Sequence, residues 1–206
     1  SVQTFTTVGY GGINPVGISA NLVATIGATL GLVTFALVTG LFFARFSRPR
    51  SHISFSKKGL LAPYQDMMSF QCRIVNRRNH KITDLSAQIT ITWLKPTKSG
   101  FIRKYANLSL ERNKIVLFPL NWTIVHPITK DSPLYNKSLD DLKKMHAEFL
   151  IMLRGYDESY NQFIHANSSY ICSELEENVK FNPMYTSSNE SFTVLNLDDL
   201  DEVTKV

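Results

Sequence analysis

The first 44 residues of this 206-residue chain contain no Asp, Glu, Lys, Arg or His, and every charged side chain follows them. Within this stretch, residues 17–44 read GISANLVATIGATLGLVTFALVTGLFFA. A helix needs about 20 such residues to cross a bilayer, and a secretory signal peptide would show a basic start and a shorter apolar core. The pattern therefore predicts a transmembrane helix. It is either a single-pass anchor or the inner helix of a bundle, for which its many small residues are suited.

Basic residues follow the apolar segment directly. Residues 45–114 carry 15 Lys and Arg against 3 Asp and Glu, whereas residues 115–206 carry 7 against 14. Positive charge beside a membrane span marks its cytoplasmic end, so we expect the C-terminal part of the chain to be cytoplasmic. We expect no nucleic-acid partner, because no aromatic residues are evidently interleaved with the basic ones on one face.

A glycine-rich segment precedes the apolar helix. Thr7-Val8-Gly9-Tyr10-Gly11 is the sequence of a potassium-channel selectivity filter. Alternate glycines allow backbone conformations closed to residues with a Cβ, so successive carbonyls can point the same way. Four such loops would give rings of K⁺ ligands from the carbonyls of Thr7, Val8, Gly9 and Tyr10, with the Thr7 hydroxyl at the inner end. The alternative, a polar linker ahead of a span, leaves the alternating glycines unexplained, because irregular backbone at membrane depth is tolerated only where it lines a pore or is buried.

The chain resembles inward-rectifier potassium channels, and their bacterial branch most of all. The resemblance rests on the filter, on the helix end TGLFFARFSRPR at residues 39–50 and on ITKDSPLY at residues 128–135, and it covers nearly the whole chain. It implies a homotetramer in a cell membrane, the inner membrane of a bacterium, that conducts K⁺ and is gated by its cytoplasmic domain and by anionic phospholipids. Such channels have another transmembrane helix before the pore helix. We therefore expect this chain to be a piece of a multi-pass protein that does not conduct alone.

The predicted membrane helix also carries a candidate gate. Gly31, Phe35, Thr39 and Phe43 recur four residues apart, so we expect them along one face. If that face looks at the pore axis, four Phe43 rings form an apolar constriction, which gates by dewetting; the alternative is contact with lipid or another helix. The resemblance places Thr39 and Phe43 at the gate. The resemblance also implies that strong rectifiers carry an acidic residue in this helix, which attracts polyamines and magnesium. The span has no acidic residue, so we expect weak rectification by this mechanism.

Five basic residues lie where the predicted helix leaves the membrane: Arg45, Arg48, Arg50, Lys57 and Lys58. Juxtamembrane clusters of this kind attract anionic lipid at about 1 kcal/mol per charge. The resemblance implies that the three arginines contact lipid headgroups. The alternative is that these charges only set topology.

The remaining residues read mostly as strands. Period-two alternation predicts strands over 69–75, 86–93, 122–126 and 149–153, and a short helix is expected over 139–147. Ser138 would be its N-cap, and Asp141 would complete a capping box. We therefore expect a membrane α plus all-β protein. Its parts are the end of a pore helix with the filter (1–16), the inner helix (17–46), a basic linker (47–58) and a cytoplasmic β-sandwich (59–206), which the resemblance implies is immunoglobulin-like and extends the pore.

The resemblance also assigns acidic residues to a cytoplasmic pore. It places Asp84 and Glu158 there, where they would concentrate cations; the alternative is ordinary solvated charge. It further implies a narrow loop over 159–163, in which the family usually has a glycine and this chain has Asn161.

Catalytic motifs are absent from the sequence. The five histidines show no paired metal spacing, and Cys72 and Cys172 lack a CxxC partner, so we expect reduced thiols. We predict no enzymatic activity, no catalytic residue and no cofactor apart from K⁺ in the filter. The function that competes with a channel is a membrane-anchored β-sandwich that binds a partner without conducting.

Overall fold

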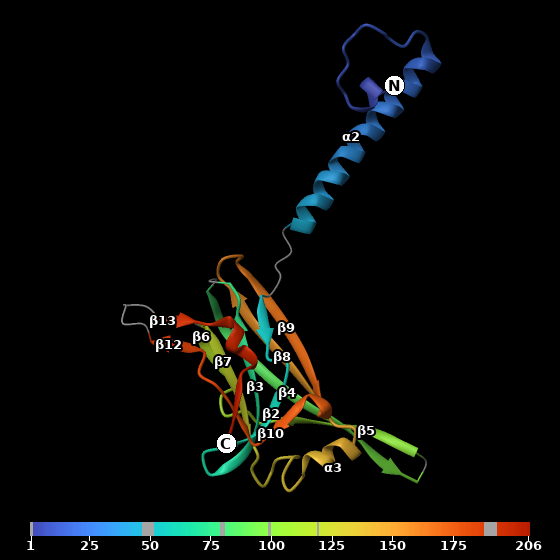
Figure 1. Cartoon of the computed structure of the whole chain (residues 1–206). Helices are drawn as coiled ribbons and strands as arrows, with labels where there is room; N and C mark the ends of the chain where they lie inside the picture. The colour runs from blue at the N-terminus through green and yellow to red at the C-terminus, as the bar shows by residue number, and fades with distance from the viewer. Residues whose placement is uncertain (1, 47–51, 79–80, 99, 119, 188–192) are drawn as a thin grey trace. The chain divides into compact units, whose positions relative to one another are not determined.

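The computed structural model describes residues 2–46, 52–78, 81–98, 100–118, 120–187 and 193–206. The chain divides into two compact units, Ser1–Pro49 and Arg50–Val206. The first unit contains a short helix α1 (Val2–Phe5) and a long helix α2 (Ile18–Phe46), joined by the glycine-rich loop. The second unit contains all the strands (Figure 1).

Helix α2 has 29 residues and is long and apolar enough, by length and composition, to cross a membrane. Its rise of 1.5 Å per residue gives a length of about 43 Å. Four threonine hydroxyls along it donate to carbonyls four residues earlier, at 2.7–2.9 Å: those of Thr25, Thr29, Thr34 and Thr39. The helix thus satisfies its own hydroxyl groups, which would be costly to leave unpaired in lipid.

The second unit is a sandwich of two five-stranded sheets. In one sheet the order is β1-β3-β2-β10, with β7 also paired to β3, and in the other it is β5-β4-β8-β9, with β6 also paired to β4. The strands are β1 (Ile53–Phe55), β2 (Gly59–Tyr64), β3 (Met67–Asn76), β4 (Ile82–Thr97), β5 (Gly100–Leu108), β6 (Lys114–Phe118), β7 (Asn121–Pro127), β8 (Glu148–Asp157), β9 (Gln162–Ile171) and β10 (Leu175–Glu177). The four strands predicted from alternation are confirmed as β3, β4, β7 and β8.

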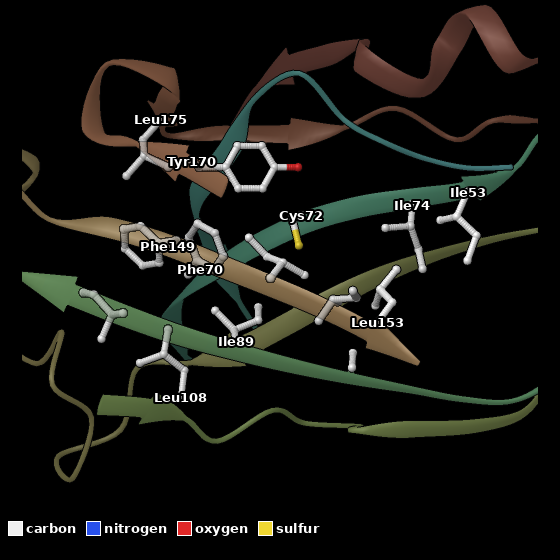
Figure 2. Close-up of a cluster of buried hydrophobic side chains, with 14 of the residues drawn as sticks. Ile53, Phe70, Cys72, Ile74, Ile89, Leu108, Phe149, Leu153, Tyr170 and Leu175 are labelled. Carbon is white, nitrogen blue, oxygen red and sulfur yellow. The ribbon is translucent and has the colours of Figure 1, made fainter. Parts of the chain in front are cut away.

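The core lies between the two sheets (Figure 2). Strands β4 and β8 alternate buried and exposed residues, as expected for sheets with one face in the core. Phe70 of β3 stacks on Phe149 of β8, with ring centroids 4.2 Å apart, and Tyr170 meets Phe70 edge-on. Cys72 is fully buried beside them, and its burial raises the pKa of the thiol to about 12, so it packs as an apolar side chain.

The C-terminal segment forms a third layer over β3. It contains β11 (Val179–Phe181) paired with β14 (Val203–Lys205), β12 (Tyr185–Ser187) paired with β13 (Thr193–Leu195), and the short helix η2 (Leu197–Asp201). Under it, Arg73 of β3 is only 4% exposed, with its guanidinium 4.4 Å from the Phe181 ring centre. Burial lowers the pKa of Arg73 to about 10, which leaves the side chain charged at neutral pH. Both faces of β3 are therefore covered.

Two further sequence expectations meet the structure here. Helix α3 (Leu139–Lys144) begins at the predicted N-cap, and Ser138 and Asp141 form the predicted capping box. The predicted linker over 47–58 is partly wrong, because β1 falls within it and pairs with β3. The apolar side chain of Ile53 enters the core, so the sandwich begins six residues earlier than expected.

Candidate functional site

The loop after α1 has an alternating backbone. Its φ angles are +59° at Thr7, +54° at Gly9 and +81° at Gly11, so every second residue is left-handed. The Thr7 N–H donates to the Thr4 carbonyl at 3.2 Å, and the Gly9 N–H donates to the Gln3 carbonyl at 3.3 Å. An added Cβ at either glycine would meet no atom within 4 Å. Glycine is therefore needed there for its φ rather than for space.

The predicted ion ligands in this loop are backbone groups. The Thr7 hydroxyl donates to the Thr6 carbonyl at 2.7 Å, which leaves its oxygen able to act as a ligand. Val8 and Tyr10 are 52% and 82% exposed in the single chain. Among the described residues, no three His, Cys, Asp or Glu side chains could hold a metal ion. The carbonyl oxygens and the Thr7 hydroxyl are thus the groups of this loop that the sequence analysis predicts as ligands.

Helix α1 contacts α2 closely at Gly31. A Cβ at Gly31 would lie 1.8 Å from the carbonyl oxygen of Phe5, so only glycine allows this approach. The less exposed residues of α2 form one stripe: Ala20, Ala24, Gly27, Ala28 and Gly31. Gly31 therefore faces α1, which corrects the expectation of one face from Gly31 to Phe43. Four-residue steps drift by about 40° each, so Phe43 lies about 120° around the helix from Gly31.

The two predicted gate residues lie on the exposed part of α2. Phe43 is 74% exposed, and the Thr39 hydroxyl donates to the Phe35 carbonyl at 2.9 Å. Both are thus open to contacts beyond the single chain, and α1 covers neither of them.

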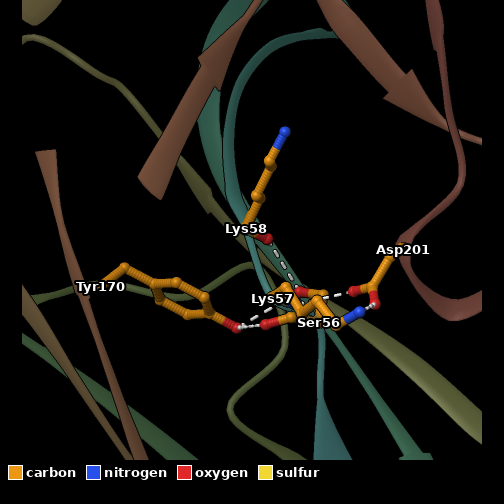
Figure 3. Close-up of polar contacts among 5 residues, drawn as sticks. All are labelled: Ser56, Lys57, Lys58, Tyr170 and Asp201. Atoms are coloured by element: carbon orange, nitrogen blue, oxygen red, sulfur yellow. Dashed lines mark hydrogen bonds and ion pairs between the residues drawn. The ribbon is translucent and has the colours of Figure 1, made fainter. Parts of the chain in front are cut away.

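The predicted lipid-contact residues are only partly described. Arg45 is exposed in the last turn of α2, while Arg48 and Arg50 lie outside the described residues. Lys57 is paired with Asp201 (Figure 3), and Lys58 is paired with a second acid of the C-terminal region. The Lys57 ammonium lies 3.6 Å from the Asp201 carboxylate, and Lys58 pairs with Glu176. These two lysines therefore have counter-charges on the sandwich.

Buried hydrogen bonds fix the chain beside these lysines. Ser56 is 3% exposed, and its carbonyl accepts from the Tyr170 hydroxyl at 2.8 Å (Figure 3). The Ser56 hydroxyl donates to the Lys58 carbonyl at 2.9 Å. The Lys57 N–H donates to Asp201 at 2.6 Å. The segment that enters the sandwich is thus held by both β9 and η2.

Asp84 and Glu158 lie at the same end of one sheet, where β4 begins and β8 ends. Ile82 pairs with Asp157, and the Glu158 N–H donates to the Lys81 carbonyl at 3.1 Å. The two predicted pore acids are thus brought together from positions 74 residues apart in the sequence. Asp84, however, forms an ion pair with Lys114 of β6 at 2.9 Å, which sequence analysis missed.

The predicted narrow loop is a tight turn after β8. The Asp157 carboxylate accepts from the N–H groups of Ser159 and Tyr160 at 2.9 and 3.3 Å. Asn161 has a φ of +52° and accepts a hydrogen bond from the Tyr156 hydroxyl. Asparagine tolerates this left-handed conformation, so the turn forms without the family's usual glycine.

A buried histidine explains part of the ITKDSPLY segment. His126 is 2% exposed, with Nδ1 2.6 Å from the Ser109 carbonyl and Nε2 2.7 Å from the Ser132 hydroxyl. Burial lowers the pKa of His126, although the Ser109 contact opposes this. Ser132 also accepts from the Leu134 N–H at 3.1 Å, and Leu134 enters the core. The sequence offered no signal for this network beyond the polar residues themselves.

Comparison with known proteins by sequence finds inward rectifier potassium channels. The family model of the inward rectifier potassium channel C-terminal domain matches residues 53–206. Over 204 residues the chain is 30% identical to the inward rectifier potassium channel Kirbac3.1 of Paramagnetospirillum magnetotacticum, covering 98% of this chain and 69% of that protein. It is 27% identical to G protein-activated inward rectifier potassium channel 2 of Mus musculus over 207 residues, covering 94% and 48%. The solved structure of the Bacillus subtilis sporulation control protein Spo0M covers 63% of this chain and 50% of that chain, at 11% identity, with a TM-score of 0.32.

Proposed function

Because the chain belongs to the inward-rectifier potassium channel family, we propose that four copies of it surround a potassium-selective pore. Residues Thr7–Gly11 of each copy form the filter. The carbonyl oxygens of Thr7, Val8, Gly9 and Tyr10 replace the water around K⁺, which is the transported ion. The C-terminal sandwich is the cytoplasmic domain of such a channel and regulates the pore.

The alternating backbone of the Thr7–Gly11 loop carries this proposal. The left-handed φ of Thr7 strains the chain, whereas Gly9 and Gly11 adopt theirs freely, and such strain persists only where surrounding structure maintains it. A linker ahead of a simple membrane anchor has no use for the pattern. The loop also precedes a helix long enough to cross a membrane. These two features favour a channel over a membrane-anchored binding module.

The gate and the lipid site belong to the same proposal. Thr39 and Phe43 of α2 form the constriction at the inner end of the pore, supported by their exposure in the single chain. Arg45, Arg48 and Arg50 contact anionic phospholipid headgroups beside that constriction, supported by their position after the apolar helix. We place the protein in a bacterial cell membrane with its sandwich in the cytoplasm, supported by the basic residues that follow α2.

Gly9→Ala tests the proposed conduction. A Cβ at this left-handed position strains the loop, so we expect at least a tenfold loss of K⁺ uptake, or loss of selectivity over Na⁺. The measurement is ⁸⁶Rb⁺ and ²²Na⁺ uptake by the full-length protein in liposomes of defined lipid composition. Gly12→Ala is the matched control, because Gly12 has no positive φ and open space around it.

The outcomes separate the two functions. Unchanged selectivity in Gly9→Ala would contradict the filter assignment. If the wild-type protein forms a folded, membrane-inserted species that passes no K⁺ in any lipid composition, the binding module is supported instead.

A further inference from the structure

Strands β11 and β14 and helix η2 form a small layer on the sheet that contains β2 and β3, and we call this layer the C-terminal cover. β11 pairs with β14 and with no strand of the two five-stranded sheets. Within the described residues, one backbone hydrogen bond joins the cover to the sheet, from the Asn178 N–H beside β11 to the Leu61 carbonyl at 3.2 Å. Side chains therefore supply most of the contacts that hold the cover in place.

The apolar contacts under the cover form two small clusters that are separate from the main core. In the first, Leu60 and Ala62 of β2 pack with Val179 and Phe181 of β11. The second joins Leu200 of η2 to β3. The main core contains many more buried side chains than either cluster. Because hydrophobic stabilisation is roughly proportional to the apolar area buried, these clusters stabilise the cover much less than the main core stabilises the sandwich.

A buried positive charge lies beneath the cover. The Nε atom of Arg73 has no hydrogen-bond partner, and its Nη1 donates to the Asp199 carbonyl at 3.4 Å. The Phe181 ring is the other contact of the guanidinium, at 4.4 Å. None of the ion pairs among the described residues includes Arg73. Burying a charge without a counter-ion costs free energy, so this side chain opposes closure of the cover.

Helix η2 of the cover also holds the segment by which the chain enters the sandwich (Figure 3). One carboxylate oxygen of Asp201 accepts from the Lys57 N–H at 2.6 Å, and the other lies 3.6 Å from the Lys57 ammonium. The same segment is fixed to β3, because the Ser56 N–H donates to the Arg73 carbonyl at 2.8 Å and the Arg73 N–H donates to the Ser56 hydroxyl at 3.2 Å. If η2 moves away, the Lys57 N–H loses its acceptor.

We propose that the C-terminal cover opens and closes as a unit while the two large sheets stay folded, and that its closure fixes residues 56–58. The single backbone hydrogen bond, the small clusters and the buried charge together make the cover less stable than the sandwich beneath it. This inference goes beyond the proposed function, because it requires neither conduction nor a tetramer. Since residues 56–58 follow α2 in the sequence, the cover gives the C-terminal end of the chain control over the segment between the membrane span and the sandwich.

Hydrogen–deuterium exchange of the full-length protein, followed by mass spectrometry, tests this inference. In wild type, residues 196–206 should exchange about tenfold faster than β4 and β8, or more. Asp201→Ala removes the acceptor of the Lys57 N–H, so exchange in residues 56–58 should rise about tenfold while β4 and β8 keep their wild-type rates. Asp198→Ala is the matched control, since Asp198 lies exposed in the same helix, and it should change neither rate.

Arg73→Met tests the effect of the buried charge. The variant keeps an apolar side chain and removes the charge, so the closed cover should become more stable and exchange in residues 196–206 should slow about tenfold. Arg154→Met is the control, because Arg154 also lies over an aromatic ring, that of Phe163 at 5.0 Å, but is exposed. It should leave exchange in the cover unchanged.

Three results would overturn the inference. If residues 196–206 exchange only as fast as β4 and β8, the cover opens only when the whole sandwich unfolds. Unchanged exchange of residues 56–58 in Asp201→Ala would show that the cover does not fix this segment. Faster exchange of the cover in Arg73→Met would show that the arginine anchors the cover. Asp201→Asn keeps an acceptor for the Lys57 N–H and should give a smaller increase in the same residues, so the result does not depend on the alanine variant alone.

Discussion

At the scale of residues, His126 couples the stability of the sandwich to pH. In its neutral form, Nδ1–H donates to the Ser109 carbonyl and Nε2 accepts from the Ser132 hydroxyl, whose oxygen accepts from the Leu134 N–H. A second proton on the ring would make Nε2 a donor as well. The Ser132 proton would then need a new acceptor in a buried site. Only the neutral imidazole therefore satisfies every group.

This geometry predicts that acid destabilises the sandwich through His126. Since burial lowers the pKa of His126, the unfolded chain takes up the proton first as pH falls below about 6.5. The unfolding free energy should then decrease by up to about 1.4 kcal/mol per pH unit, until the folded-state pKa is reached. His126→Gln, which retains a donor and an acceptor without titrating, should reduce this slope.

Tryptophan fluorescence measures the effect, because Trp93 and Trp122 both pack on the sandwich core. Denaturant unfolding at pH 7.5 and 5.5 gives the slope for each variant. His165→Gln is the control, since His165 is exposed on β9. Identical slopes in wild type and His126→Gln would exclude His126 as the titrating group.

At the scale of elements, helices α1 and α2 of the first unit make one close contact. It depends on Gly31, whose Cα faces the Phe5 carbonyl. Because α1 leads into the Thr7–Gly11 loop, a displaced α1 displaces the proposed filter. Gly31 is thus the position of α2 at which the approach of α1 depends on glycine.

We predict that Gly31→Ala reduces K⁺ flux at least tenfold, because its Cβ would lie 1.8 Å from the Phe5 oxygen and must push α1 away. Gly40→Ala is the control, since a Cβ there meets no atom within 4 Å. Liposome flux at matched protein amounts measures both. Normal flux in Gly31→Ala would show that α1 sits elsewhere in the assembled protein.

Strands and α3 were predictable because their signals are local. The alternation of β4 and of β8 is visible within each strand. Ser138 and Asp141 of the capping box are close together in the sequence. The burial of Arg73 was not predictable: an arginine between apolar neighbours reads as the solvent face of a strand. Only the third layer, formed more than 100 residues later, covers it.

In the candidate site, too, contiguous motifs are visible in the sequence, whereas long-range contacts are not. The proposed filter is a contiguous motif of five residues, so the sequence alone suggests it. The partners of Asp84 and Lys57 are 30 and 144 residues away, and no periodicity links them.

For the whole molecule, the basic residues after α2 fall into two groups. Lys57 is paired with Asp201 of η2, and Lys58 is paired with Glu176 of the neighbouring strand β10. Arg45 belongs to the end of α2, and Arg48 and Arg50 follow it in the sequence. Attraction to headgroups falls off within a Debye length of about 8 Å at physiological salt, and the arginines lie nearer to α2 in the sequence than the lysines do.

We therefore predict that neutralising the three arginines to Gln weakens the response of flux to anionic lipid more than tenfold, given about 1 kcal/mol per charge. Changing Lys57 and Lys58 to Gln should leave the response within about twofold of wild type. The measurement is K⁺ flux against the mole fraction of anionic lipid, with filter selectivity as the internal control. Superimposable curves for the arginine variant and wild type would mean that the cluster sets topology alone.

The sandwich depends on contacts from residues that are synthesised late, and this affects the order in which it folds. Asp201 contacts Lys57 across 144 residues, and β2 receives its parallel neighbour β10 only late in the sequence. At about 5–20 residues per second, the ribosome needs roughly 7–30 s to reach Asp201 after it has added Lys57. During this interval β2 lacks its neighbour β10, and the face of β3 that carries Arg73 lacks the layer that covers it. The sandwich is therefore complete only after residues 175–201 have been synthesised.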